Sequence, residues 1–171
     1  MKKYLLTLLL LPLISLKVND WVTVKIDDRT SVEFPAQPVV EDLNGAPYYE
    51  NENTGEEKCI VMVTDFGKMG VDSATLSQSM SRTAALGELR DGLLRDAKGS
   101  TLLSEKRLQV DGKLAFEYYI NTGVNKPGNY NRMYYRAIVF KDRLYSLYFY
   151  EDAGKPRQEM RKRFFDSFKT L

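Results

Sequence analysis

The sequence contains no histidine and only one cysteine, Cys59. Without histidine, Ser-His-Asp and Cys-His catalysis, histidine-ligated zinc and imidazole acid–base chemistry are all excluded. An intramolecular disulfide cannot form from one cysteine, so the stability of the chain has to come from its core. Cys59 begins the apolar run 59–63, where burial raises a thiol pKa and hides the sulfur. We therefore expect an inert core residue rather than a redox thiol.

Long apolar runs are also scarce, and the longest is at the start of the chain. Lys2 and Lys3 precede about a dozen mostly apolar residues, and the run ends before Lys17. A spanning helix needs roughly 18 to 20 apolar residues, whereas a basic pair before a short apolar run is typical of a secretory signal peptide. We predict a signal peptide at residues 1–16, no transmembrane anchor after its removal, and export to the periplasm or exterior of a bacterium. A buried N-terminal strand or helix is the alternative.

The chain also lacks a strong net charge. Loss of Lys2 and Lys3 with the signal peptide lowers the basic count from 25 to 23, which equals the 23 acidic residues. A neutral chain lacks the positive field that non-specific nucleic-acid binding requires, so no nucleic-acid partner is expected. The basic cluster at residues 161–163 alternates with apolar residues and fits the solvated side of a helix, with an anion contact as the alternative. Residues 17–171 suit a single domain.

Alternation of apolar and polar residues predicts strands in the first third of the chain. Residues 21–26 and 31–34 form a predicted hairpin, and residues 39–43 and 47–51 form two strands around the turn dipeptide Asn44-Gly45. Residues 57–66 are apolar on both faces around 59–63, which is typical of a central strand. The polar segment 50–55 faintly resembles a calcium loop, but Val61 stands where the bidentate carboxylate belongs. We therefore interpret it as a hairpin loop and predict no metal site.

Two helices are predicted, one in the middle of the chain and one at its end. Asp72 can cap a helix that Gly99 terminates, and apolar residues recur at helical spacing between them, so the spacing predicts a helix over about 72–98. A second helix over about 156–170 begins at Pro156 and carries Met160, Phe164 and Phe168 on one stripe.

Four antiparallel strands are predicted between these helices, at about 102–110, 113–121, 129–140 and 143–150. Asp111-Gly112 is the strongest hairpin signal, a second reversal lies near Lys141-Asp142, and a longer loop covers residues 122–128. Short connections require antiparallel pairing. The fold class is therefore α+β, an antiparallel sheet of about 6–8 strands with the mid-chain and C-terminal helices packed on it.

Several segments together resemble the PsbP-like family. They are FPAQP at 34–38 after the first hairpin, the mid-chain helix, RLYSL at 143–147 and RFFDSF at 163–168. This fold is shared by photosystem II extrinsic subunits, the Ran-binding Mog proteins and exported bacterial proteins of unknown function. The resemblance implies an antiparallel sheet with helices on its faces and, in most members, a binding or scaffolding role. It carries over no catalytic residue, and photosynthetic or Ran-binding activity does not follow from it.

Tyrosine is the one residue in excess, with 11 in the chain. Adjacent pairs point to opposite faces of a sheet, so one face can present aromatic rings to a ligand or partner. The loop at 123–131 is rich in glycine and asparagine, and long loops often carry function. The candidate binding residues are Tyr48, Tyr118, Asn125, Tyr130, Arg132 and Tyr134. The alternatives are tyrosines packed under helices and a loop without function.

These observations favour a non-catalytic, exported binding or interaction domain with no cofactor and with a protein or small ligand as its partner. One alternative is a carrier of a small apolar ligand between sheet and helix. Another is a hydrolase that uses Asp and Glu alone, since two carboxylates suffice for glycoside chemistry. A pair of carboxyl groups with raised pKa in a pocket would favour the enzyme, and an exposed aromatic patch without such a pair would favour the interaction domain.

Overall fold

A computed structural model describes residues 21–43, 45–53, 56–96, 99–123 and 130–171 of the chain. The predicted signal peptide and Asn125 lie outside these residues. The described part forms ten strands, three α-helices and a short 3-10 helix at Gly67–Met69. The strands are β1 (Val22–Lys25), β2 (Thr30–Phe34), β3 (Val39–Leu43), β4 (Ala46–Asn53), β5 (Glu57–Asp65), β6 (Thr101–Val110), β7 (Lys113–Asn121), β8 (Arg132–Phe140), β9 (Arg143–Glu151) and β10 (Lys169–Thr170). The helices are α1 (Ser73–Ser81), α2 (Ala84–Asp96) and α3 (Gln158–Asp166).

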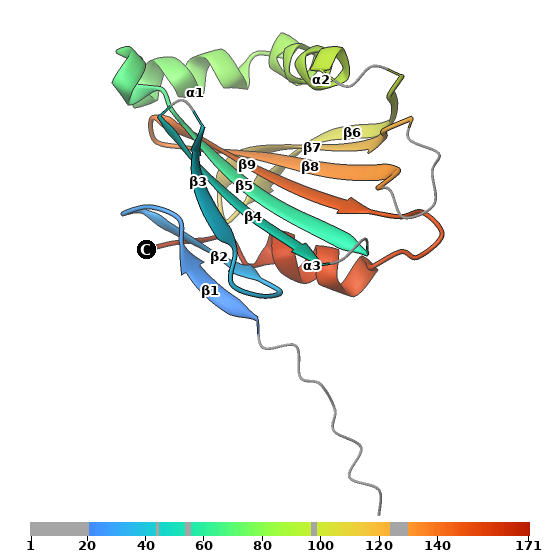
Figure 1. Ribbon diagram of the computed structural model, residues 1–171. Coiled ribbons are helices and arrows are strands. Elements are labelled where there is room, and N and C mark those ends of the chain that lie inside the picture. Colours follow the sequence, from blue (N-terminus) through green and yellow to red (C-terminus); the bar gives the residue numbers. More distant parts are fainter. Residues whose placement is uncertain (1–20, 44, 54–55, 97–98, 124–129) are drawn as a thin grey trace, which may run out of the picture.

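One seven-stranded sheet organises the molecule, with strand order β3-β4-β5-β9-β8-β7-β6. All neighbouring strands in it are antiparallel. A second, three-stranded sheet has the order β1-β2-β10. Helices α1 and α2 lie on one side of the large sheet, and α3 lies with the small sheet on the other side (Figure 1). The predicted α+β class with an antiparallel sheet and packed helices is confirmed.

Each side of the large sheet has its own hydrophobic core. On the α3 side, Phe34 of β2 and Phe164 of α3 are fully buried, with ring centroids 5.5 Å apart in an edge-to-face contact. On the α1–α2 side, Leu76 and Ala85 of the helices pack over Phe116, Tyr118 and other residues of the central strands. Because both faces of β8 and β9 are largely covered, most positions of these two strands are apolar. Cys59 lies in the core on the α3 side and is fully buried, as expected from the apolar run 59–63.

The mid-chain helical segment is present but is divided in two. Asp72 caps α1 by accepting a hydrogen bond from the Thr75 amide at 2.7 Å, as the sequence predicts. Arg82 then takes an extended backbone conformation, with ψ of 147°, before α2 begins. The guanidinium of Arg107 on β6 donates hydrogen bonds to the Met80, Ser81 and Arg82 carbonyl oxygens at 3.3, 2.9 and 2.5 Å. A contact from a distant strand thus satisfies the carbonyl groups at the end of α1 and allows the chain to turn there.

The C-terminal helix is shorter than the spacing predicts, because the chain ends in a strand. After α3, β10 pairs with β2, where Lys169 lies opposite Ser31. The Leu171 amide also donates to the Arg29 carbonyl oxygen at 2.8 Å. The predicted N-terminal hairpin therefore belongs to a separate small sheet that the C-terminus completes, rather than to the large sheet.

Candidate binding groove over strands β3 to β5

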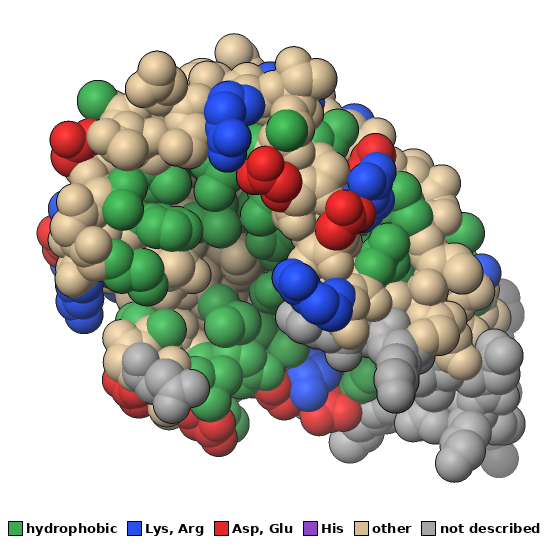
Figure 2. All heavy atoms as spheres, turned by 90° about the horizontal axis from the view of Figure 1, so that it is seen from above, with side chains coloured by type: hydrophobic (Ala, Val, Ile, Leu, Met, Phe, Trp, Pro, Cys, Tyr) green, Lys and Arg blue, Asp and Glu red, His purple; other side chains and the backbone are tan. Residues whose placement is uncertain are grey.

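The helices cover only part of their side of the large sheet. Helix α1 packs on β8 and α2 packs on β6, so β3, β4 and β5 extend beyond them. Figure 2 looks onto this side and shows a hollow with mostly hydrophobic walls and acidic side chains along its lower rim. The hollow over β3 and β4 has a volume of about 660 Å³. Its lining includes Val39, Glu41, Leu43, Tyr48, Glu50 and Glu52.

Cross-strand pairing explains why these side chains share one face. Residues directly opposite each other in a sheet project to the same side. Val39 pairs with Glu50, Glu50 with Ile60, and Ile60 with Tyr148, which makes one row across the sheet. A parallel row runs from Glu41 through Tyr48 to Met62.

The first row continues as a series of tyrosines beneath the helices. The ring centroids of Tyr148 and Tyr135 are 4.7 Å apart, and those of Tyr135 and Tyr118 are 5.8 Å apart. Tyr148 is partly exposed, whereas Tyr135 and Tyr118 are buried. Stacked and tilted aromatic pairs stabilise such a row beyond their area burial. The aromatic floor of the groove therefore extends under the helices as part of the core.

The polar groups of the groove carry an excess of negative charge. The Lys58 ammonium lies 2.8 Å from Glu50 Oε1 and 3.9 Å from Glu52 Oε2. The Tyr48 hydroxyl also donates a hydrogen bond to Glu50. Burial raises the pKa of Glu50, but the hydrogen bonds from Lys58 and Tyr48 outweigh it, and the pKa is lowered. With Glu41 also in the lining, three carboxylates stand against one ammonium.

Tyr48, Tyr118 and Tyr130, three of the predicted binding residues, lie on or near this face. Tyr48 lines the groove itself. The Tyr130 hydroxyl donates to Glu52 Oε1 at 3.0 Å, which places it at the end of the groove. Tyr118 is buried under α2 and its hydroxyl donates to the Leu86 carbonyl oxygen at 2.7 Å. Of these three, only Tyr48 and Tyr130 are brought together by the polar chain through Glu50, Lys58 and Glu52.

Arg132 and Tyr134 lie on the opposite face, toward α3. The Tyr134 ring stacks on Tyr119 with centroids 4.3 Å apart, and the Arg161 guanidinium of α3 lies 3.7 Å from the Tyr134 ring centroid. The Arg132 guanidinium is 5.9 Å from the Tyr119 ring centroid. These two residues do not share a site with Tyr48, and a binding role for either stays a prediction.

Sequence reasoning missed Glu50, which lines the groove, and Tyr148 and Tyr150, which cross-strand pairing places on the same face of the sheet. The spacing of two between Tyr148 and Tyr150 placed both on one face, and their rings stack with centroids 6.3 Å apart. The sequence does not indicate which face of the large sheet the helices leave open.

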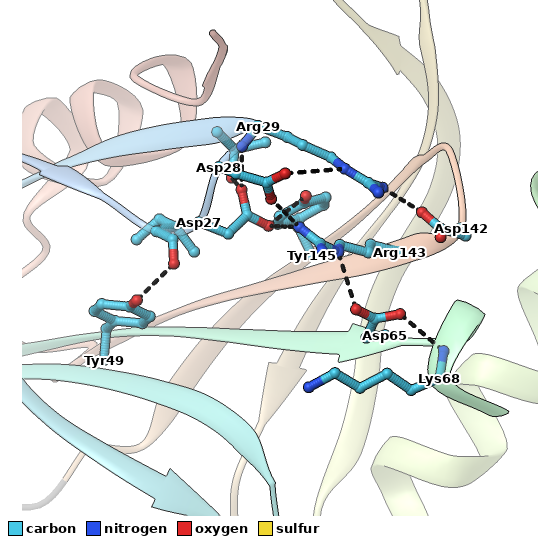
Figure 3. Close-up of polar contacts among 11 residues, drawn as sticks. Asp27, Asp28, Arg29, Tyr49, Asp65, Lys68, Asp142, Arg143 and Tyr145 are labelled. Atoms are coloured by element: carbon cyan, nitrogen blue, oxygen red, sulfur yellow. Dashed lines mark hydrogen bonds and ion pairs between the residues drawn. The ribbon is translucent and has the colours of Figure 1, made fainter.

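A second polar cluster joins the turn between β1 and β2 to the start of β9 (Figure 3). Arg143 Nη1 donates to Asp27 Oδ2 at 2.8 Å and to Asp28 Oδ1 at 2.7 Å, and Arg143 Nε donates to Asp65 Oδ2 at 3.2 Å. The Tyr145 hydroxyl donates to Asp27 Oδ2 at 2.7 Å. Burial raises the pKa of Asp27, but hydrogen bonds from Tyr145 and other donors outweigh it, and the pKa is lowered. The carboxylate is held ionised, which suits a structural lock between strands rather than an acid–base pair.

Two buried glutamates form a third cluster, where α3 meets the sheet. Glu57 and Glu151 lie opposite each other on β5 and β9, and both are 1% exposed. Glu151 accepts hydrogen bonds from the Arg157 amide at 2.8 Å and from Arg161 Nη1 at 2.7 Å. Arg157 Nε lies 3.7 Å from Glu57 Oε2. Cations of the α3 segment thus neutralise both carboxylates and fix the helix to the sheet.

Carboxyl groups whose pKa departs clearly from its ordinary value all depart downward. They are Asp27, Asp28, Glu50, Asp72, Glu117 and Asp142. Across the described ranges, no group of three acidic or cysteine side chains is placed to hold a metal ion. In the same part of the chain, no helix has both the length and the apolar character needed to cross a bilayer.

Comparisons with known proteins identify the fold but not a family. No family model and no curated protein match the chain. The chain is similar to the solution structure of cyanobacterial PsbP (CyanoP) from Synechocystis sp. PCC 6803, with a TM-score of 0.59, 9% identity, and coverage of 92% of this chain and 96% of that chain. A weaker similarity, with a TM-score of 0.36 and 9% identity, is to a Bacteroides thetaiotaomicron VPI-5482 crystal structure, covering 83% of this chain and 45% of that chain. The protein therefore has a PsbP-like fold.

Proposed function

From this PsbP-like fold and its groove, we propose that the protein is a non-catalytic domain that binds a basic, partly apolar segment of a partner polypeptide. The observation that carries the proposal is the hollow of about 660 Å³, in which Val39, Leu43 and Tyr48 lie beside three carboxylates. Apolar side chains beside excess carboxylates favour a ligand with both apolar groups and cations. A purely apolar ligand would bury carboxylates without a counter-charge.

In the part of the chain that the structure describes, no carboxyl group has a clearly raised pKa, which supports a non-catalytic role. The two carboxylate clusters outside the groove are neutralised by Arg143 and by Arg157 and Arg161. Asp27, Asp65 and Glu151 already accept hydrogen bonds from these guanidinium groups, and the pKa of Asp27 lies below its ordinary value. A general acid at neutral pH needs the opposite shift.

The proposal is tested by peptide binding to paired variants on the two faces of the sheet. The probe is a labelled peptide of alternating lysine and valine, and its binding is measured by fluorescence anisotropy. We expect the double variant Tyr48→Ala, Tyr150→Ala to lose at least about tenfold in affinity, which corresponds to about 1.4 kcal/mol. The control Tyr119→Ala removes a half-buried tyrosine from the opposite face and should bind as the parent does. Equal effects of both variants, or tighter binding of a peptide with glutamate in place of lysine, would contradict the proposal.

A second candidate, a carrier of a small apolar ligand, is favoured by one observation. The tyrosine row passes from Tyr148 in the groove to Tyr135 and Tyr118 under the helices, so displacement of α2 would lengthen an aromatic site. Native mass spectrometry of gently purified protein separates the two functions. A copurifying small molecule whose mass disappears in the Tyr148→Ala variant would support the carrier.

The proposal also covers the compartment in which the protein acts. We infer that the protein acts after export, in the periplasm or outside a bacterial cell, because Lys2, Lys3 and the short apolar run that follows match a signal peptide. Mass spectrometry of the protein recovered from a secreting host tests this inference. A mature chain that begins near residue 17 supports it, and an intact Met1 in the cytoplasm contradicts it.

A further inference from the structure

The outer edge of β3 is an open end of the large sheet. β3 is first in the strand order and, among the described residues, pairs only with β4. All five of its residues are exposed, and Val39 and Val40 retain 64% and 55% of their accessible surface. An exposed edge strand with apolar side chains is a template for pairing with another extended segment.

The position of Pro47 shows which backbone groups face this edge. Pro47 on β4 lies directly opposite Asp42. A hydrogen-bonded antiparallel pair exchanges two N–H···O bonds, and proline has no N–H group, so Asp42 and Pro47 form a non-hydrogen-bonded pair. Because the two kinds of pair alternate, Val40 and Tyr49 form another. The N–H and C=O groups of Val40 and Asp42 therefore point away from β4 toward the open edge.

The other edge of the sheet, β6, has a less regular backbone pairing. Its pairing with β7 shifts between Leu102 and Ser104, and such an irregularity interrupts a flat edge. Lys106 lies 2.8 Å from Glu117, and Arg107 is engaged by the carbonyl groups at the end of α1. Helix α2 also packs on β6. The pairing of β3 with β4 has no such shift, so β3 is the regular edge of the two.

We propose that β3 accepts an extended segment of a partner protein as an eighth strand of the large sheet. This inference rests on the proposed function and adds the mode of binding to it. In an antiparallel register, the segment carries a lysine or arginine opposite Glu41 and apolar residues opposite Val39 and Leu43. These three side chains line the groove, so alternate side chains of the added strand enter the hollow while its backbone bonds to the edge.

The charges on β3 favour pairing with a strand of a partner protein over pairing with β3 of a second copy of this chain. Self-pairing centred on Glu41 places that carboxylate opposite itself, and like charges directly opposite are destabilising. Self-pairing centred on Val40 avoids this contact but brings Glu41 and Asp42 of both copies into one patch. A segment with lysine opposite Glu41 instead pairs opposite charges and offsets the carboxylate excess of the groove.

A backbone-modified peptide tests the mode of binding directly. The probe is a labelled, blocked seven-residue peptide with threonine at each end and the central order isoleucine, lysine, lysine, valine, valine, which lie opposite Leu43, Asp42, Glu41, Val40 and Val39 in turn. N-methylation of the two residues opposite Val40 and Asp42 removes the amides that face β3. We expect this to weaken binding by at least tenfold in fluorescence anisotropy. Methylation of the two residues opposite Glu41 and Leu43, whose amides face away, is the matched control and should change affinity less than threefold.

Two variants of the protein complete the test. Val40→Pro removes an outward amide that β4 does not use, and Glu41→Lys reverses the charge in the groove. We expect both to weaken binding at least tenfold, and Glu41→Lys to bind a probe with glutamates in place of lysines more tightly than the parent does. Thermal melting of each variant confirms that it is folded.

The outcomes separate this inference from the proposed function. If both methylated peptides bind alike while Tyr48→Ala, Tyr150→Ala still abolishes binding, the groove binds polypeptide without strand addition and only this inference fails. If none of the variants changes binding, both fail. If native mass spectrometry shows a dimer of the parent protein and a monomer of the Val40→Pro variant, the occupant of the edge is a second copy of this chain and this inference is overturned.

Discussion

Arg143 contacts carboxylates from two separate parts of the chain, the β1–β2 turn and the end of β5. Its side chain is 16% exposed, and its partners Asp27 and Asp65 are 13% and 20% exposed. Removal of the guanidinium leaves these partly buried carboxylates without a cation, and we expect Arg143→Ala to lower the free energy of unfolding by about 2 to 3 kcal/mol. Urea denaturation measures the loss. Arg82→Ala is the control, since its pair with Glu88 is 58% and 59% exposed and should contribute less than about 0.5 kcal/mol. Equal losses would show that the cluster does not lock the strands.

We expect the same cluster to make the stability of the protein depend on pH. The pKa values of Asp27 and Asp28 are lowered from the ordinary 3.8, and so is that of the neighbouring Asp142, whose carboxylate accepts a hydrogen bond from Arg29. A carboxyl whose pKa is depressed by folding contributes stability above its unfolded value and loses it as pH falls through the folded value. Stability should therefore decline below about pH 4 and stay nearly flat between about pH 5 and 8, because the chain has no histidine to titrate there.

Thermal melting from pH 2 to 8 measures this profile. Asp27→Asn should be less stable than the parent at pH 7, and the difference between the two should shrink as the pH falls, since the parent then loses its charged Asp27. A stability change centred between pH 5 and 8, or a difference that grows in acid, would contradict the assignment.

At the scale of elements, one contact from β6 decides where α1 ends. Arg107 donates to the carbonyl groups of Met80, Ser81 and Arg82. Arg107→Ala leaves these carbonyl groups without that donor, and we expect a loss of about 1 kcal/mol in unfolding free energy, with faster amide hydrogen exchange in α1 and unchanged exchange in β9. The neighbouring variant Lys106→Ala, which removes a side chain that is 62% exposed, should leave exchange in α1 unchanged. Slow exchange in α1 of the Arg107 variant would show that the turn at Arg82 does not depend on this contact.

The strands followed from the sequence because their signals are local. The period of two and the Asp111-Gly112 dipeptide predicted the β6–β7 hairpin, and both turn residues have the positive φ, 50° and 73°, that such a turn requires. The division of the mid-chain helix and the strand β10 were not predictable in this way. Both depend on partners far along the chain, Arg107 for the helix and Ser31 of β2 for β10.

The candidate groove was predictable only in part, for a related reason. That Tyr48 and Tyr49 face opposite sides follows from the strand alone, and Tyr49 is indeed buried with its hydroxyl bonded to the Ile26 carbonyl oxygen at 2.6 Å. Which side remains open depends on where the helices and the small sheet pack. Sequence reasoning therefore grouped Tyr48 with Tyr134, although the sheet separates them.

At the scale of the whole molecule, the two layers that cover the large sheet differ in how firmly they are attached. On the α3 side, Phe164, Phe165 and Phe168 are at most 4% exposed, and Arg161 pairs with buried Glu151 at 2.7 Å. On the other side, Leu76 and Ala85 are the only buried residues of the described parts of α1 and α2. Fewer buried apolar contacts favour local opening.

Amide hydrogen exchange should reveal this difference. We expect the amides of α1 and α2 to exchange at least tenfold faster than those of α3, which corresponds to about 1.4 kcal/mol in opening free energy. Opening of this layer would expose Tyr135 and Tyr118 and extend the aromatic floor of the groove beyond Tyr148. A bound ligand that uses the extended floor would slow exchange in α2, whereas a strand added at β3 would slow exchange in β3 and leave α2 unchanged. Equal exchange in all three helices would show that the helical cover is as stable as the rest and that the groove has a fixed length.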